Sequence, residues 1–598
     1  MKAVLIFNNV NDLTFSKWDD EFIKRMKSFS DQEDDPNVTD SYSVSQLMSP
    51  IITSQRVMAA QFGNTYSSMQ CKDGTNIVFD EWLDHVLMIV SEDDVDNMHR
   101  ELLDCKTYVQ HICGQNFNLL HSSVYQDWLS VLLDNRSKGD YVPGASGIIG
   151  ETGASATALN SLKATAKDIK CSSFSHYHLL LFVGNKMLAL YSSRGCEDLT
   201  PADVILLSSQ SVSAQEYWAG TEKGDSQKDG THNHLPWLSE QNSAIVNLCA
   251  GSSNSPCSPH SMHIAEVAPR ITLLIIVDME LRETGIAVQL SSGLLCNLRG
   301  LLLQRNLDLL PSTLDSLEGA IKKTTDALRK NKLSSSVGTR LTTRMVDLRK
   351  SCTTTTPLTP ETAATALRSA LESVIELLRP DIPSLNTNAP LRELREKMAP
   401  FFDFLRVKAM RFFGLGSYPF QLYTTYDTCS YISLTRHKYV EEFPGLIHFI
   451  YIDRTTGRYL APDMADCADL LTPKALRGMV SRGLRLLREG YTAATWRGGA
   501  VHACALLWWE KGGSPVKPAT LHPAAVRALH PPGDILGTFY RQLSELAFPN
   551  ENSGVVIKEL LCIHLGLLPA ATALQQARRL AHTVLELAGD CTSAADLL

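Results

Sequence analysis

The amino-acid sequence predicts an α/β protein in which three similar modules follow one another, with a helical connector before the third. Three observations support this prediction. The same order of two strands, a helix, further strands and closing helices can be assigned to three blocks of the chain. Inside each block, the spacing of apolar residues changes from the period of strands to that of helices. A stretch rich in Gly, Ser and Thr separates the first two blocks, and prolines interrupt the segment before the third.

The first module is expected over residues 1–136. Its opening strand is a short apolar run, and a later helix carries apolar residues at three-four spacing. Pro50 predicts a kink or a break near Ser49 in the longest helix of the module, and the acidic segment 30–40 is interpreted as a flexible insertion. Strands are expected at residues 2–7, 13–16, 65–70, 76–82 and 85–90, and helices at 19–29, 44–62, 95–112 and 124–133.

Residues 137–172 are predicted to be a flexible linker, because Pro143 and four nearby glycines lie there among Ser, Thr and Ala. The second module is expected over residues 173–312. Gly184-Asn185 joins its first two strands as a turn pair, and Thr200-Pro201 supplies a cap and a first helical residue. Strands are expected at 177–183, 186–191, 262–268 and 271–278, helices at 200–217 and 285–306, and a disordered insertion at 219–261.

The helical connector is expected over residues 313–438, and the third module over 439–598. An apolar strand and a turn ending at Gly457 open that module, and a basic amphipathic helix follows. Strands are expected at 446–452, 458–461, 493–496 and 502–510, and helices at 473–489, 534–548 and 555–587, with a break near Pro569 in the last.

The composition places the chain among ordinary globular proteins. It has 598 residues, a net charge of -8 and 14 cysteines in no regular pattern. The acidic balance argues against a nucleic-acid partner, and the scattered cysteines favour reduced thiols over a disulfide framework. The apolar run at the N-terminus is too short for a signal peptide. No uninterrupted apolar stretch approaches the roughly 20 residues of a membrane span, so only peripheral membrane association is expected.

The sequence contains none of the motifs that usually mark a reaction centre. There is no phosphate-binding Gly-rich loop with its lysine, no Gly-x-Ser-x-Gly and no His-Glu-x-x-His. One loose group of residues has the side chains that zinc binds, but its spacing is not one of the standard ligand pairs. The group comprises Cys249, Cys257, His260 and His263, with His232 and His234 as further candidates. We therefore predict no catalytic, cofactor-binding or metal-binding residue.

Two other features have plain structural interpretations. His448 lies inside an apolar strand, which favours a core histidine. Arg477, Arg482, Arg485 and Arg488 follow one helix, and a solvated face is favoured over lipid binding.

One long segment, residues 442–457, resembles the tri-longin Rab guanine-nucleotide exchange factors of the Hermansky–Pudlak syndrome type. The resemblance continues at Ala461-Pro462. It recurs in chain order at residues 49–54, 188–193, 199–203 and 564–569. It does not extend over 134–168 or 219–261, so no function is transferred to those segments.

The resemblance implies three longin domains, each an antiparallel sheet flanked by helices. It also implies a heterodimer with Hermansky–Pudlak syndrome protein 4 as obligate partner, in the biogenesis of lysosome-related organelles complex three. That complex promotes GDP release from Rab GTPases of the melanosome and lysosome-related-organelle subfamily. The implied location is the cytoplasm, with peripheral recruitment to endosomal and lysosome-related membranes. No cofactor and no covalent catalysis are implied.

The first module is where we expect Rab to bind, on the helix at 44–62 and the strands beside it. The residues selected on this helix are Gln46, Gln55, Arg56 and Met58. Two other functions remain open. A longin adaptor would bind GTP-loaded Rab without accelerating nucleotide loss. A hydrolase or metal enzyme is disfavoured by the missing motifs.

Overall fold

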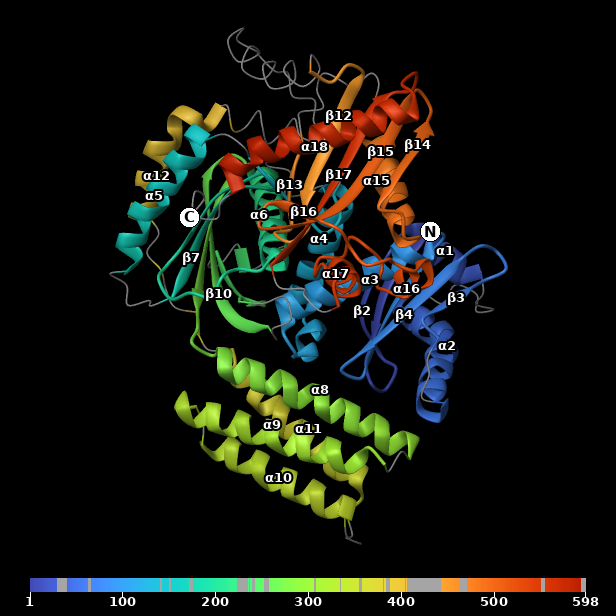
Figure 1. Ribbon diagram of the computed structural model, residues 1–598. Helices are drawn as coiled ribbons and strands as arrows, with labels where there is room; N and C mark the ends of the chain where they lie inside the picture. Colours follow the sequence, from blue (N-terminus) through green and yellow to red (C-terminus); the bar gives the residue numbers. More distant parts are fainter. Residues whose placement is uncertain are drawn as a thin grey trace. The chain divides into compact units, whose positions relative to one another are not determined.

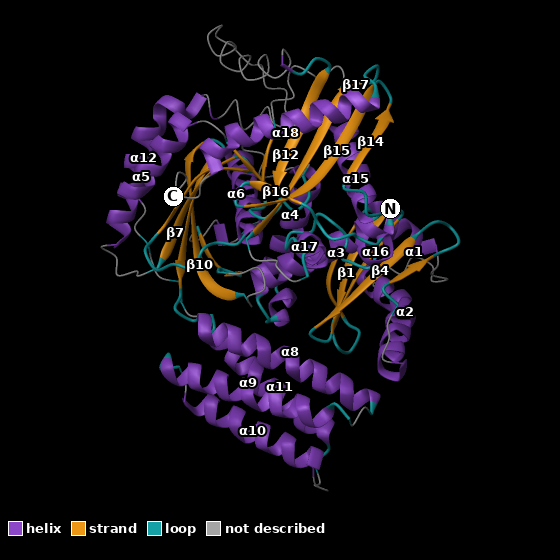
Figure 2. Ribbon diagram, viewed as in Figure 1, coloured by secondary structure: helices purple, strands orange, loops and turns teal. Residues whose placement is uncertain are grey.

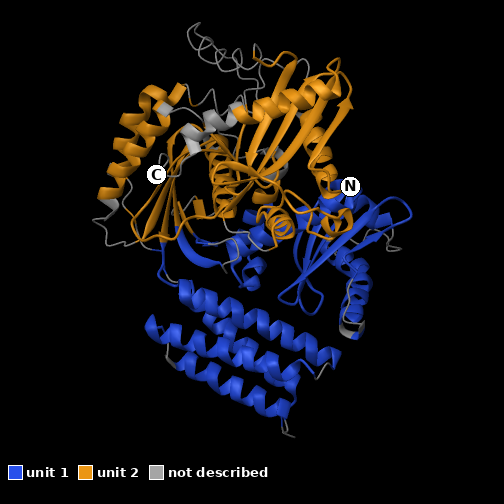
Figure 3. Cartoon of the chain, in the orientation of Figure 1, with its two compact units in different colours: residues 1–130, 245–261, 278–383 blue, residues 131–244, 262–277, 384–598 orange. Residues whose placement is uncertain are grey.

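The computed structural model describes most of the chain in two compact units (Figure 3). Unit 1 comprises residues 1–130, 245–261 and 278–383, and unit 2 comprises residues 131–244, 262–277 and 384–598. The described residues are 1–28, 40–62, 66–139, 142–149, 152–170, 176–222, 235, 237–238, 242–251, 257–305, 308–333, 335–353, 358–379, 381–382, 385, 388–403, 405, 442–461, 471–549 and 554–592.

Unit 1 contains a five-stranded antiparallel sheet in the order β2-β1-β5-β4-β3 (Figure 2). The first strand, β1, pairs at both edges, with β2 and β5, and its residues after Lys2 are buried on both faces of the sheet. The strands are β1 (Lys2–Phe7), β2 (Leu13–Trp18), β3 (Ser68–Gln70), β4 (Asn76–Trp82) and β5 (His85–Ser91).

Helices follow the strands of this sheet in the predicted order. Side chains of α1 and α2 share one core with alternate residues of β1, β4 and β5, and α3 packs on β4 and β5. The helices are α1 (Asp20–Ser28), α2 (Asp40–Phe62), α3 (Val95–Cys113), the 3-10 helix η1 (Phe117–His121) and α4 (Ser123–Gly139), which crosses the boundary between the units. The order predicted for this module is confirmed.

Helix α2 runs through Pro50 without a break, so of the two outcomes expected there, a kink or a break, the break does not occur. Val44, Met48 and Ile52 lie on one stripe of the helix and are all buried, and this packing holds the helix together around the missing N–H. Most of the insertion predicted at 30–40 lies outside the described residues; Asp40 begins α2.

Four long helices of unit 1 lie side by side as a bundle (Figure 1). Each packs on the next, and the last packs on the first, around a core of leucines and alanines. They are α8 (Arg282–Gln304), α9 (Leu310–Lys330), α10 (Ser335–Thr353) and α11 (Pro360–Leu377). The helical character of the predicted connector is confirmed for these segments, and α8, predicted to close the second module, joins them.

Among the described helices, α8 alone is long and apolar enough to cross a membrane by length and composition. One third of its most apolar window, 33%, is buried inside the chain. Val288, Leu295 and Leu298 enter the bundle core, so packing against neighbouring helices accounts for much of its apolar content. The sequence estimate considered only uninterrupted apolar runs and therefore did not single it out.

The other sheet has the order β14-β15-β17-β12-β13-β6-β8-β7-β11-β10-β9, with β16 paired to β15. It runs through the predicted second and third modules. Its strands are β6 (Ser146–Ile148), β7 (Tyr177–Val183), β8 (Lys186–Ser192), β9 (Ser243–Leu248), β10 (Ser258–Ala268), β11 (Ile271–Asp278), β12 (Leu446–Asp453), β13 (Arg458–Leu460), β14 (Ala493–Gly498), β15 (Val501–Lys511), β16 (Ser514–Val516) and β17 (Val555–Leu565).

The prediction of a flexible linker at 137–172 was wrong for much of its length. Strand β6 pairs in parallel with both β13 and β8 and so joins the strands of the two modules into one sheet. Thr152–Lys170 form helix α5, which buries Ala154, Ala158 and Leu162. The small residues were interpreted as low complexity, but they allow close packing of α5 against the sheet and α12 (Asn388–Met398).

Two further predictions needed correction in the same unit. Residues 555–565 form strand β17, not the start of a helix, and β17 lies inside the sheet between β12 and β15, with which it pairs. Apolar residues on both faces of a central strand can be confused with a buried helix, although Val555, Val556 and Ile557 favour a strand. The disordered insertion expected at 219–261 contains β9 and the start of β10; residues 223–234, 239–241 and 252–256 lie outside the described residues.

Helices cover both faces of the third module's strands. One face packs on α15 and the opposite face on α18, and Thr472 caps the start of α15 through its side chain. The remaining helices of unit 2 are α6 (Pro201–Glu222), α15 (Pro473–Arg488), α16 (Pro523–Arg527), α17 (Thr538–Ala547) and α18 (Ala570–Thr592), with the 3-10 helix η2 (Ala399–Phe401). Residues 406–441 of the predicted connector lie outside the described residues.

Candidate functional site

Helix α2 presents one stripe of side chains outward from unit 1. Tyr42 is 55% exposed and Val57 is 43% exposed, and Gln46 and Pro50 are exposed between them. These residues are spaced by four, four and seven positions, that is by about one or two helical turns, so they share one side of the helix. The side chain of Gln46 donates a hydrogen bond to the hydroxyl of Tyr42 at 3.4 Å. We call this set, Tyr42, Gln46, Pro50 and Val57, the α2 stripe.

The four residues selected from the sequence occupy different environments. Gln46 belongs to the α2 stripe, whereas Gln55 is only 2% exposed. Met58 is half-buried. The four selected residues therefore differ in accessibility. Of the four, only Gln46 is exposed, and Gln55 cannot contact a second protein unless the helix moves.

Arg56 connects α2 to two turns of the sheet below it. Its guanidinium donates to the carbonyl oxygen of Asn8 at 2.6 Å and to that of Asp84 at 3.2 Å. Burial lowers the pKa of Arg56, while the nearby carboxylates of Glu81 and Asp84 oppose that change. Since arginine stays protonated at any physiological pH, this residue fixes the position of the helix on the sheet.

The turn between β4 and β5 is strained and is held from outside the sheet. Leu83 and Asp84 both adopt positive φ, 48° and 63°, which a two-residue hairpin turn requires but which glycine or asparagine adopts more easily. The carboxylate of Asp84 forms ion pairs with Arg299 of α8 and Arg368 of α11. Residues other than glycine keep a positive φ only where neighbouring groups hold the backbone in place. Here Arg299 and Arg368, from two helices of the bundle, hold the turn through Asp84.

A small cavity of about 60 Å³ lies beside this turn, between Phe117, α8 and α11. His85 stacks on the ring of Phe117 with the ring centroids 3.8 Å apart, and burial lowers its pKa to about 4. Burial raises the pKa of the Cys296 thiol to about 12. At neutral pH the histidine is therefore uncharged and the thiol protonated, so neither group is poised for nucleophilic chemistry.

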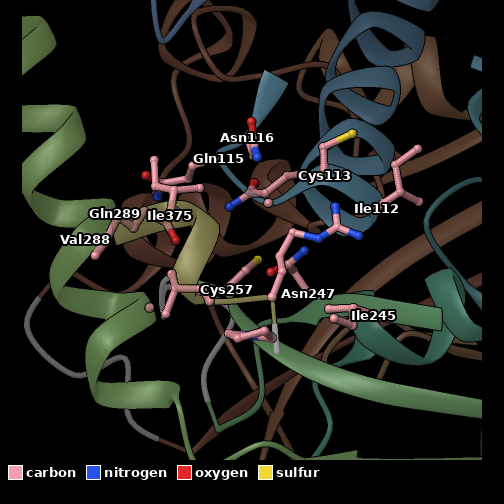
Figure 4. Close-up of a pocket in the computed structure, with 16 residues that line it drawn as sticks. Ile112, Cys113, Gln115, Asn116, Ile245, Asn247, Cys257, Val288, Gln289 and Ile375 are labelled. Carbon is pink, nitrogen blue, oxygen red and sulfur yellow. The ribbon is translucent and has the colours of Figure 1, made fainter. Parts of the chain in front are cut away.

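A second cavity, of about 40 Å³, lies where the end of α3, strand β9, α8 and the end of α11 meet (Figure 4). Its polar lining consists mainly of side-chain amides, among them Gln115, Asn116, Asn247 and Gln289. Gly114 takes φ +62°, and a Cβ there would lie 3.1 Å from the Asn247 amide oxygen. Each cavity has room for a few waters and is far below the several hundred Å³ of a typical small-molecule site.

The loose zinc candidates do not form a metal site in the part of the chain that the structure describes. No group of three His, Cys, Asp or Glu side chains converges there. The sulfurs of Cys249 and Cys257 lie 2.9 Å apart, and Nδ1 of His260 lies 2.9 Å from the carbonyl oxygen of Ser258. His232 and His234 lie outside the described residues.

The other two interpretations from the sequence agree with the structure of unit 2. His448 is 1% exposed, and burial lowers its pKa to about 3, as expected of a core histidine. Arg477, Arg482 and Arg485 are exposed along α15. Arg488 is half-buried and donates to the carbonyl oxygen of Arg527 at 3.4 Å.

Comparison with protein families identifies both ends of the chain. A family model described as the first longin domain of FUZ, MON1 and HPS1 matches residues 2–130. A second, described as the third longin domain of FUZ, MON1 and HPS1, matches residues 445–588. The first range covers the five-stranded sheet with α1 to α3 and η1, and the second covers β12 to β17 with α15 to α18.

The fold and these two matches define a protein with longin domains at both ends and a helical segment between them. Over residues 2–130 and 445–588, the chain is similar to the first and third longin domains of FUZ, MON1 and HPS1. This similarity is consistent with a subunit of a Rab guanine-nucleotide exchange complex.

Sequence reasoning missed the contact between the β4–β5 turn and the bundle. Asp84 is separated from Arg299 by 215 residues and from Arg368 by 284, so no local pattern could pair them. One signal was present: a Leu-Asp pair stands between two apolar strands where a turn would usually carry Asn-Gly or Asp-Gly. A turn of unfavourable residues indicates that something else stabilises it.

Proposed function

We propose that this chain takes the role of HPS1 within its family, as one subunit of a heterodimeric exchange factor. Its partner in this proposal is Hermansky–Pudlak syndrome protein 4, and the complex promotes GDP release from Rab GTPases that serve lysosome-related organelles. The protein acts in the cytoplasm and is recruited peripherally to endosomal and lysosome-related membranes. The observation that carries the proposal is the pair of family matches at residues 2–130 and 445–588.

Nucleotide exchange requires a shaped surface and no reacting side chain. An exchange factor binds the nucleotide-free GTPase better than the GDP-bound form, and it shifts the equilibrium by that difference in affinity. The cavities beside α3 and α8 are small, and the cysteine and histidine of the first cavity are protonated and neutral, respectively. These features suit a binding surface better than a reaction centre.

The α2 stripe is the surface that we propose for Rab. It combines an exposed aromatic ring, an amide and an exposed valine on one helix, and aromatic residues often contribute most to binding at interfaces. Arg56 acts indirectly, because it anchors α2 to the Asn8 and Asp84 turns. Gln55 takes no part in this proposal.

The test is release of a fluorescent GDP analogue from a Rab of this subfamily. The full chain is co-purified with Hermansky–Pudlak syndrome protein 4 and added at a catalytic amount. Acceleration of about tenfold or more, equivalent to roughly 1.4 kcal/mol, is expected. A folded complex that leaves the release rate unchanged contradicts the proposal.

The same experiment distinguishes an adaptor from an exchange factor. An adaptor of longin domains would bind the GTP-loaded Rab more tightly than the GDP-loaded form and would not accelerate nucleotide loss. Affinities of the complex for Rab in its GDP, GTP and nucleotide-free states therefore accompany the rate measurement. The exchange proposal expects the tightest binding for the nucleotide-free state.

A further inference from the structure

Two cysteines face each other at the ends of neighbouring strands. Cys249 directly follows β9, and Cys257 directly precedes β10. The two strands are neighbours in the sheet, so the residues that connect them bring the two thiols together. The sulfur atoms lie 2.9 Å apart, which is only about 1 Å longer than a disulfide bond.

The pair lies against the first turn of α8. Arg282 donates to the carbonyl oxygen of Ala250 at 3.1 Å. A Cβ on Gly285 would lie 3.6 Å from the carbonyl oxygen of Cys257 and 3.3 Å from the ring of Pro259. The backbone around Cys257 therefore sits directly on the helix, and this helix belongs to the bundle that grips the β4–β5 turn.

The two thiols differ in accessibility. Cys249 is 7% exposed, whereas Cys257 is half-buried, and Cys257 also lines the second cavity together with Asn247 (Figure 4). A small oxidant can therefore reach Cys257 first, and Cys249 is close enough to resolve the product. A partly accessible thiol beside a second thiol that can resolve it is the usual arrangement of a redox-sensing pair.

Other cysteines in the described part of the chain provide the contrast. Cys504 and Cys562 lie opposite each other on β15 and β17, but both are fully buried. Burial raises the pKa of the Cys504 thiol to about 12 and that of Cys562 still further above its ordinary value. A thiol that stays protonated and shielded reacts slowly with oxidants. Two cysteines that lie opposite each other on neighbouring strands, as Cys504 and Cys562 do, are therefore not expected to act as a redox pair when both are buried.

We propose that Cys249 and Cys257 form a reversible disulfide when the protein meets a peroxide. The thiolate of Cys257 attacks one oxygen of hydrogen peroxide, which gives a sulfenic acid and releases hydroxide. The thiol of Cys249 then displaces the sulfenic oxygen as water, and the S–S bond forms. Two thiols lose two electrons and two protons, and the peroxide is reduced to two waters. A dithiol reductant restores both thiols by exchange.

The disulfide fixes the backbone at Cys249 and Cys257 beside the first turn of α8. It joins the ends of β9 and β10 covalently and holds Cys257 at the wall of the second cavity. The modification is independent of the exchange activity proposed above, because it depends only on the chemistry of these two residues.

The test is peptide mapping of the full-length protein, purified with its partner under reducing conditions and then titrated with hydrogen peroxide. After alkylation of the remaining thiols and digestion with trypsin, both cysteines lie in one peptide, residues 229–270, because no Lys or Arg stands between them. This peptide is expected to be linked internally through Cys249 and Cys257, to carry no alkyl group on either cysteine, and to be about 2 Da lighter than its reduced form. It should form at lower peroxide than any modification of Cys352, a half-buried cysteine in the bundle, and dithiothreitol should remove it. Because the unmodified chain is measured, no variant needs to fold.

Two results would overturn the inference. One is oxidation of Cys257 to sulfinic acid without the linked peptide, and the other is alkylation of both thiols at peroxide levels that already modify Cys352. The Cys249→Ser protein gives a second readout: dimedone should label Cys257 in this variant, whereas Cys352→Ser should leave the linked peptide unchanged. Absence of dimedone labelling on Cys257 would also contradict the proposed order of steps.

Discussion

The first and third longin domains of this chain are built from the same order of elements but end differently. The sheet of the first domain has its own edges, β2 and β3, and all five strands come from residues 2–91. In the third domain, β13 pairs onward with β6, and the sheet continues into β8, β7 and β11. The first domain is therefore a self-contained platform, whereas the third is one part of a larger sheet.

The difference lies in how each domain is anchored. In the first domain, a strained turn is held by two arginines of the bundle. In the third domain, Arg454 at the β12–β13 turn is buried, with its side chain 1% exposed, and pairs with Glu559 at 2.7 Å. It also donates to the carbonyl oxygen of Pro143 at 2.7 Å, next to β6. The Asp84 ion pairs are partly exposed to solvent, whereas the Arg454–Glu559 pair is buried. Removing the buried pair should therefore lower the free energy of unfolding more than removing the exposed one.

The largest expected effect comes from Arg454→Ala. This change leaves Glu559 buried without its partner and removes the cation over the Tyr540 ring, so unit 2 should lose about 3–5 kcal/mol of stability. Hydrogen exchange measured by peptide should show lost protection across β12, β13, β17 and β6. As a control, Lys397→Ala breaks a half-exposed pair with Glu393 and should cost about 0.5 kcal/mol or less. If Arg454→Ala and Lys397→Ala lowered the stability by the same amount, the buried pair would not stabilise the fold more than the exposed pair.

A smaller effect concerns pH and His564 in the third domain. Burial, and then the nearby His502, lowers the pKa of His564 from 6.5 to about 4. The unfolded chain therefore binds a proton that the folded chain does not between pH 6.5 and about 4. Stability is complete above pH 6.5 and falls as the pH decreases through this window.

His564→Leu should flatten that decrease by about 2 kcal/mol between pH 7 and pH 5. Urea unfolding followed by tryptophan fluorescence at the two pH values measures it. His530→Gln, at an exposed histidine of the same unit, should leave the pH dependence as it is. An unchanged slope in His564→Leu would mean that this histidine does not contribute.

The smallest expected effect comes from Asp84→Asn in unit 1. The amide keeps the volume and tolerates positive φ, but Arg299 and Arg368 lose their shared carboxylate, so the contact should weaken by about 1–2 kcal/mol. Faster hydrogen exchange is expected in β4, β5 and α8, and the difference should shrink at high salt. Lys330→Ala, which removes an exposed pair with Glu283, serves as control. Unchanged hydrogen exchange at the β4–β5 turn in Asp84→Asn would show that the turn keeps its conformation without the two arginines.

Much of the fold followed from local patterns, and the failures have physical causes. The strands and α3 of the first domain were predictable because alternating and three-four spacings are strong there. Strand β6 is only three residues long and owes its existence to β13 and β8 on either side. Strand β17 is buried on both faces, so its apolar residues carry little alternation.

The candidate site was less predictable than the fold. The sequence indicated helix α2 but not which of its faces stays exposed. Gln55 and Gln46 look equivalent in the sequence, and only the packing of α2 on the sheet and on α8 buries one and leaves the other accessible. The arginines that hold the β4–β5 turn, to which Arg56 of α2 binds, lie 215 and 284 positions from Asp84, and no local spacing can reveal them.

The most direct test of the account compares GDP release by complexes that carry surface variants of the first domain. Tyr42→Ala with Val57→Ser alters the α2 stripe, while Val346→Ser alters an equally exposed valine on α10. If the stripe contributes about 1–2 kcal/mol to binding of the Rab, the first complex should be about 5–30-fold less effective and the second unaffected. Equal exchange rates for both complexes would contradict the claim that the first longin domain contacts Rab through α2.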